Sequence, residues 1–123
     1  MSRAEVRIPL ADAPAAGQVR MLDLGGHRVG LYRVGDALHA LADRCPHRGA
    51  PLCSSGRTVH GIYLSEGSPT QGADRAYVRC PWHKWDYDIA TGRCLVYPQM
   101  RVRRYRVTIE SDDVVVRLEH PER

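Results

Sequence analysis

Residues 80–88 read CPWHKWDYD and residues 45–51 read CPHRGAP, so a short phrase of cysteine, proline and histidine occurs twice in the chain. Cysteine and histidine side chains bind zinc and iron–sulfur centres. The proline after each cysteine has a fixed φ and stiffens a tight loop. Each phrase follows an expected strand and precedes turn residues. Two such loops lying side by side would form one four-ligand site.

The predicted ligands form two mixed pairs, Cys45 with His47 and Cys80 with His83. Zinc accepts two cysteines and two histidines, but zinc fingers pair cysteine with cysteine and histidine with histidine. A [2Fe–2S] cluster can take two cysteines on one iron and two histidines on the other, which suits one mixed pair on each loop. The spacing therefore favours the iron–sulfur cluster and leaves zinc as the alternative.

The rest of the chain predicts an all-β fold, a small antiparallel sandwich or barrel. Glycine, proline and aspartate punctuate it at short intervals, and hairpins are expected across Gly25-Gly26 and across the acidic turn at 111–113. We find no convincing amphipathic helix. The expected strands are Glu5–Ile8, Gln18–Asp23, His27–Val34, Ala37–Ala42, Ala76–Arg79, Arg101–Glu110 and Val114–Glu119.

One of these strands shows a clear alternation. Within Arg101–Glu110, the side chains of Tyr105, Val107 and Ile109 are expected on one buried face, because successive side chains of a strand point to opposite sides. No strand is expected within residues 57–75, which are interpreted as a surface loop.

Length and composition predict one soluble domain over residues 1–123, with 43% hydrophobic and 26% charged residues. No apolar run approaches the ~20 residues of a membrane span, and the N-terminal residues lack the apolar core of a signal peptide. We therefore expect a cytoplasmic protein with no membrane partner. Cys53 and Cys94 are expected to be buried apolar residues, although a disulfide between them stays open.

The formal net charge is +4, and the arginines crowd at 101–106. A nucleic-acid partner is not expected, because no aromatic platform or recognition helix accompanies them. The first interpretation is a solvated strand face, and the second is a docking patch for an acidic protein. The crowded residues are Arg101, Arg103, Arg104 and Arg106.

Through 45-CPH-47 and 80-CPWH-83, and through the flanks HRGAPL and KWDYDIATGRCL, the chain resembles a Rieske [2Fe–2S] protein of the soluble ferredoxin type. The resemblance implies antiparallel sheets with a cluster-binding subdomain of two ligand loops, and one [2Fe–2S] cluster as cofactor. Cys45 and Cys80 would hold the buried iron. His47 and His83 would hold the outer iron, close to the surface where partners dock.

The resemblance also implies the surroundings of the cluster. Tyr87 matches a family tyrosine whose hydroxyl donates to a ligand sulfur, and Pro98 is the candidate for a covering proline loop. Trp85 replaces a serine of high-potential members, which predicts the lower part of the ~ −150 to +300 mV range. The residues expected around the cluster are Pro46, Leu52, Trp82, Lys84, Trp85, Tyr87 and Pro98.

The function implied is that of a one-electron carrier, a Rieske-type ferredoxin that passes electrons from a reductase to a terminal oxygenase or similar redox enzyme. No mononuclear-iron domain or nucleotide fingerprint accompanies the motifs, so the chain itself is not expected to be an enzyme. The alternatives are a tightly bound small subunit of a larger redox enzyme, resembling that of nitrite reductase, and a redox-sensing or zinc-binding structural module.

Overall fold

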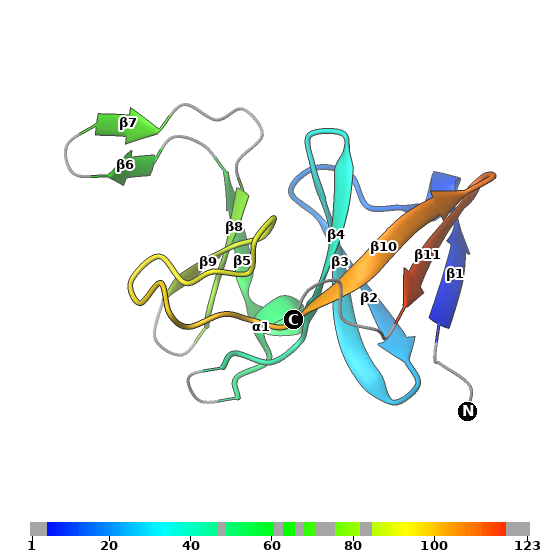
Figure 1. Cartoon of the computed structure of the whole chain (residues 1–123), viewed down its shortest axis with the longest axis horizontal. Coiled ribbons are helices and arrows are strands. Elements are labelled where there is room, and N and C mark those ends of the chain that lie inside the picture. The colour runs from blue at the N-terminus through cyan, green and yellow to red at the C-terminus, as the bar shows by residue number, and fades with distance from the viewer. Residues whose placement is uncertain are drawn as a thin grey trace.

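The main body of the protein is a six-stranded antiparallel sheet with the order β1-β11-β10-β4-β3-β2 (Figure 1). The two edge strands β1 and β2 also contact each other, so the sheet nearly closes into a barrel. Its strands are β1 (Glu5–Pro9), β2 (Val19–Leu24), β3 (His27–Val34), β4 (Ala37–Ala42), β10 (Arg104–Glu110) and β11 (Asp113–Arg117). The computed structural model describes residues 5–46, 49–60, 63–65, 68–70, 76–81 and 85–117.

A smaller unit lies beside this sheet, on the left in Figure 1. It consists of a three-stranded sheet of order β5-β8-β9, a short helix and a separate hairpin of β6 and β7. Both cysteine–proline phrases belong to this unit, one after β4 and one after β8. Its elements are α1 (Leu52–Ser55), β5 (Arg57–His60), β6 (Tyr63–Ser65), β7 (Ser68–Thr70), β8 (Ala76–Arg79) and β9 (Asp86–Asp88).

The all-β prediction is confirmed, and so are both predicted hairpins. Leu24 pairs with His27 across the two glycines, and Glu110 pairs with Asp113 across the acidic turn. Gly25 and Gly26 have φ of 60° and 92°, which is the backbone conformation that a tight hairpin turn needs. The register of these strand pairs is therefore set by the two turns that the sequence predicts.

Several elements were not predicted from the sequence. The segment 57–76 contains β5, β6 and β7 rather than being only a loop, and α1 and the single-turn 3-10 helix η1 (Leu10–Asp12) are present. Three or four residues are too few to reveal a period, so these elements depend on pairing with neighbours. Among the described residues, no helix is long and apolar enough to cross a membrane.

The strand predicted over Arg101–Glu110 begins only at Arg104, because the Val102 amide bonds to the carbonyl of Gly92 at 2.8 Å instead of entering the sheet. Tyr105 is buried as expected. Ile109, however, is 53% exposed, since the core stops short of the hairpin end. The expected buried face was therefore wrong at this residue.

Two hydrophobic clusters stabilise the fold. One fills the main sheet between β2, β3, β10 and β11, with Leu31 and Val114 fully buried. The other joins the main sheet to the smaller unit. It contains Tyr32 and Leu41 from the main sheet and the residues Cys45, Cys80, Val78, Tyr87, Ile89 and Cys94 from the smaller unit. The sites of both phrases are therefore anchored in a core that both units share.

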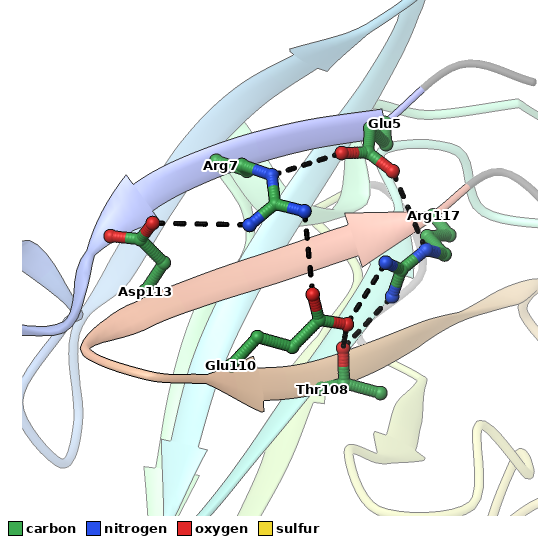
Figure 2. Close-up of polar contacts among 6 residues, drawn as sticks. All are labelled: Glu5, Arg7, Thr108, Glu110, Asp113 and Arg117. Atoms are coloured by element: carbon green, nitrogen blue, oxygen red, sulfur yellow. Dashed lines mark hydrogen bonds and ion pairs between the residues drawn. The ribbon is translucent and has the colours of Figure 1, made fainter.

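The outer face of β1, β10 and β11 carries a network of charged side chains (Figure 2). Arg7 lies 3.0 Å from Glu5 and 3.3 Å from Glu110, and Arg117 lies 2.9 Å from Glu110 and 3.4 Å from Glu5. Such exposed pairs contribute little individually, but they gather carboxylates at this end of the molecule. The members are Glu5, Arg7, Thr108, Glu110, Asp113 and Arg117.

The shared core can be tested with Leu41, which is fully buried in β4. Leu41→Ala is expected to lower the free energy of unfolding by about 2–5 kcal/mol, because it removes buried methyl groups and leaves a cavity. Ile109→Ala, at an exposed position, is the control and is expected to change it by less than about 0.5 kcal/mol. Urea unfolding monitored by tryptophan fluorescence measures both. Equal losses in the two variants would contradict the assignment of the core.

Candidate metal centre

The first ligand loop follows β4 and closes on itself through two backbone hydrogen bonds. The amide of Cys45 donates to the carbonyl of Ala50 at 2.8 Å, and the amide of Gly49 donates to the carbonyl of Cys45 at 2.7 Å. Gly49 has a φ of 77°, which favours glycine at this turn. Cys45 is buried and Pro46 is exposed. The loop therefore buries Cys45 and presents Pro46 to solvent.

Asp43 ties this loop to the helix that follows it. Its Oδ1 accepts from the amides of Cys53 at 2.7 Å and Ser54 at 3.0 Å, and its Oδ2 accepts from the Ser54 hydroxyl at 2.8 Å. Arg28 Nε lies 3.3 Å from Oδ2. Burial alone would raise the pKa of Asp43, but these hydrogen bonds outweigh it and lower the pKa. An ionised carboxylate thus caps α1 and clamps both ends of the loop.

The second ligand loop connects β8 to β9. The Cys80 amide donates to the carbonyl of Trp85 at 2.8 Å, and Cys80 is fully buried. At the base of the loop, Arg79 holds Asp86 by two hydrogen bonds, Nε to Oδ1 at 2.8 Å and Nη2 to Oδ2 at 3.1 Å. A two-point arginine–carboxylate contact fixes geometry as well as adding stability. The two strands are therefore locked together directly below the loop.

Tyr87 points its hydroxyl into the space between the two loops. Its oxygen lies 3.1 Å from Cys45 Sγ and 3.9 Å from Met100 Sδ, and the residue is fully buried. Burial and the neighbouring cysteines, Cys45 first among them, raise the pKa of the Tyr87 hydroxyl. The hydroxyl therefore keeps its proton and can donate it toward a sulfur that bears negative charge.

A third loop, residues 95–99, lies next to the second ligand loop. The Tyr97 ring packs on Trp85 with 4.8 Å between ring centroids, and the Tyr97 amide lies 3.5 Å from Cys94 Sγ. Pro98, the predicted covering proline, is exposed within this loop. Leu95, Val96 and Tyr97 are exposed apolar side chains beside it. Trp85 and the third loop thus form an apolar wall beside Cys80.

The two remaining cysteines are confirmed as buried free thiols, so no disulfide joins Cys53 to Cys94. Burial raises the pKa of the Cys53 thiol to about 12. Its Sγ donates to the carbonyl of Ala42 at 3.4 Å. A thiol that stays protonated is a poor nucleophile and a poor metal ligand, so Cys53 acts as a packing residue.

The structure brings together five of the predicted residues that it describes, whereas Pro46 and Pro98 are exposed. Cys45, Cys80 and Tyr87 share one buried cluster with Leu52, and Trp85 packs against it. Trp82, Lys84 and the two predicted histidine ligands, His47 and His83, lie outside the described residues. Asp43, Arg79, Asp86 and Met100 were not predicted from the sequence. The opposite charges of Arg79 and Asp86, on either side of 80-CPWH-83, were a usable signal for this pair.

Two buried cysteines on separate loops, neither of them in a disulfide and one of them next to the Tyr87 hydroxyl, suit a group that takes soft sulfur ligands. A [2Fe–2S] cluster with two cysteine ligands on one iron fits this donor set. The buried position of both sulfurs fits the inner iron. The exposed position of Pro46, next to Cys45, suits ligands that must reach solvent.

Comparison with known proteins agrees with this chemistry. The sequence matches the family model described as a Rieske [2Fe-2S] domain over residues 6–106. It is 31% identical over 111 residues to the 3-phenylpropionate/cinnamic acid dioxygenase ferredoxin subunit of Shigella boydii, with 89% of each chain covered. It is also 37% identical over 102 residues to human apoptosis-inducing factor 3, covering 82% of this chain but only 14% of that protein's length.

Solved structures show the same architecture. The ferredoxin of carbazole 1,9a-dioxygenase from Nocardioides aromaticivorans IC177 has a TM-score of 0.69 at 25% identity, with 91% of this chain and 95% of that chain covered. A protein of Mycobacterium tuberculosis assigned as the small subunit of an NADH-dependent nitrite reductase has a TM-score of 0.70 at 22% identity, covering 97% and 98%, and shows the shared fold alone. With the family match over most of its length, the chain belongs to the Rieske [2Fe–2S] family, whose members bind a [2Fe–2S] cluster.

Proposed function

We propose that this protein is a one-electron carrier, a Rieske-type ferredoxin whose cluster is held by Cys45, His47, Cys80 and His83. The observation that carries the proposal is the pair of buried cysteines on two closed loops, neither of them in a disulfide, with the Tyr87 hydroxyl 3.1 Å from Cys45 Sγ. When bound, the cluster supplies a site that gains and loses one electron. We also propose that residues 1–123 act as one domain, supported by the core that both units share.

The residues around the site have separate roles in this proposal. Cys45 and Cys80 lie in the core, where water is excluded, and they hold the inner end of the site. Pro46 and Pro81 follow them and are exposed, so the chain reaches the surface directly after each cysteine. Electrons would therefore enter and leave at the tips, where His47 and His83 are expected. Tyr87 donates toward the sulfur of Cys45 and favours the reduced state.

The partners proposed are a reductase that supplies electrons and a terminal oxygenase, or a similar redox enzyme, that receives them. Support comes from the Shigella boydii relative, named as a ferredoxin subunit of a dioxygenase. A solved complex of oxygenase and ferredoxin in carbazole 1,9a-dioxygenase has a chain with a TM-score of 0.69 to this one. The protein would act as a component of such a system and not as an enzyme alone. Its four cysteines, none of which is in a disulfide, suit the reducing cytoplasm.

A second candidate is a permanently bound small subunit of a larger redox enzyme. It is favoured by the exposed side chains of Leu95, Val96 and Tyr97, of which Val96 is 53% exposed, because a lasting interface is more apolar than a transient one. Size-exclusion chromatography of the protein purified from its own cells separates the two. A stable heteromer supports the subunit, and a monomer that reduces an added oxygenase supports the ferredoxin.

The proposed cofactor is tested by anaerobic purification, assay of iron, sulfide and zinc, and EPR after dithionite reduction. We expect two irons and two sulfides per chain and a rhombic Rieske-type signal. One zinc, no sulfide and no signal would overturn the electron-transfer proposal in favour of a structural metal module.

The four cysteines provide a matched comparison. Cys45→Ser and Cys80→Ser are expected to abolish the EPR signal, because each removes a proposed ligand of the inner iron. Cys53→Ala and Cys94→Ala are expected to retain it, since their thiols pack in the core. Iron and sulfide content measured on all four folded variants checks this. Loss of the cluster in Cys53→Ala with retention in Cys45→Ser would show that the ligands are assigned wrongly.

Tyr87→Phe is expected to lower the reduction potential while leaving the cluster bound. The hydroxyl stabilises negative charge on sulfur, and a loss of about 1 kcal/mol corresponds to about 40 mV for one electron. Redox titration followed by EPR measures the shift. The control is Tyr105→Phe, in the other core cluster, which should leave the potential unchanged. Equal shifts in the two variants would argue against a hydrogen bond to the cluster.

A further inference from the structure

Four arginines surround one cavity beside the first ligand loop. The cavity has a volume of about 480 Å³ and includes Pro46 and Gly49 of that loop in its wall. We call it the basic pocket, defined by Arg28, Arg44, Arg101 and Arg103. It lies between the β2–β3 turn, the first ligand loop and the segment that leads into β10.

The arginines of the basic pocket are held by the structure. The guanidinium carbon of Arg44 would lie 3.6 Å from a Cβ placed on Gly49, so its charge lies against the backbone of the ligand loop. The guanidinium of Arg103 lies over the ring of Tyr105, 5.6 Å from its centroid. Arg28 contacts Asp43, yet its side chain is 64% exposed. Positive charge is thus arranged at defined positions facing the solvent.

The pocket carries an excess of positive charge. Among the described residues that line it, Asp43 is the only one with a carboxylate, and that side chain is 3% exposed and already accepts hydrogen bonds from Cys53 and Ser54. The carboxylates of Glu5 and Glu110 belong instead to the network on the outer face of β1, β10 and β11 (Figure 2). Carboxylates thus outnumber arginines in that network, whereas arginines outnumber carboxylates among the described residues of the pocket.

Building on the proposed function, we propose that the basic pocket receives carboxylate side chains of an acidic redox partner and so docks that partner beside the first ligand loop. Guanidinium groups match carboxylates in geometry as well as charge. Such complementarity increases the rate of encounter and orients the partner. Because Pro46 and Gly49 form part of the wall, a docked partner would lie next to the tip where electrons are proposed to leave.

A single concave pocket favours this occupant over nucleic acid, which calls for a basic stripe that follows a phosphate backbone. The pocket also extends beyond the segment 101–106, whose arginines suggested a basic patch in the sequence. Arg44 and Arg28 come from other elements, and Arg104 and Arg106 line a different cavity on β10. The docking surface is therefore formed by the fold and not by one run of arginines.

The proposal is tested first with two small oxidants of opposite charge. Hexacyanoferrate(III) and hexaammineruthenium(III) each take one electron from the reduced protein. Arg101→Gln with Arg103→Gln is expected to slow oxidation by the anion at least about ten-fold at low ionic strength and to speed oxidation by the cation. The matched control, Arg20→Gln with Arg106→Gln, removes the same total charge from exposed positions outside the pocket. It should change either rate by no more than about two-fold.

Arg44→Gln is a second variant that controls for a folding effect of the double variant. It removes a charge of the pocket from a different element, and it should change both oxidation rates in the same direction as the double variant. All variants must show the native EPR signal, which keeps loss of the cluster apart from loss of docking. Equal rates in the pocket double variant and the control would overturn the docking site. An absent EPR signal in the native protein would instead overturn the proposed function.

Binding of a fluorescein-labelled peptide of ten glutamates, followed by anisotropy, gives a readout independent of electron transfer. We expect the pocket double variant to bind the peptide about ten-fold more weakly than the control double variant. Inorganic phosphate at matched ionic strength should displace the peptide no better than sodium chloride does. Displacement by phosphate at low concentration would overturn the carboxylate assignment in favour of a phosphate site.

Discussion

The structure depends on holding two cysteine sulfurs in fixed positions at the ends of two strands. Each loop meets this requirement by closing on its own backbone, through Cys45 to Ala50 and through Cys80 to Trp85. Neither closure uses a disulfide, since none of the four cysteines forms one. Hydrogen bonds of this kind are modest in energy, so the loops need support from the charged contacts beneath them.

That support comes from two carboxylates, each of which lies at the base of one ligand loop. Asp43 clamps the first loop by capping α1, and Asp86 clamps the second by its two-point contact with Arg79. Both carboxylates are nearly buried, with side-chain exposures of 3% and 8%. A buried charge is costly unless it is paired or hydrogen-bonded. Loss of the arginine or of the amide hydrogen bonds would therefore leave an uncompensated carboxylate beside a ligand loop.

Much of the architecture could be predicted because its signals are local. Gly25-Gly26 and the acidic turn set the two hairpins. Three kinds of feature could not be predicted. The three-residue strand β9 forms through pairing with β8, the cap by Asp43 acts on a helix ten residues away, and Ile109 is exposed because of where the core ends. Each depends on tertiary contacts that no short pattern reveals.

The hydrogen bond between Tyr87 and Cys45 has a consequence for the order in which the chain assembles. The clamp of the first loop spans ten or eleven residues, and that of the second spans seven, so both can form early with little loss of chain entropy. Tyr87 and Cys45 are 42 residues apart. Joining the two loops therefore costs more chain entropy than closing either clamp, and a cofactor that bridged them would stabilise folding at that step.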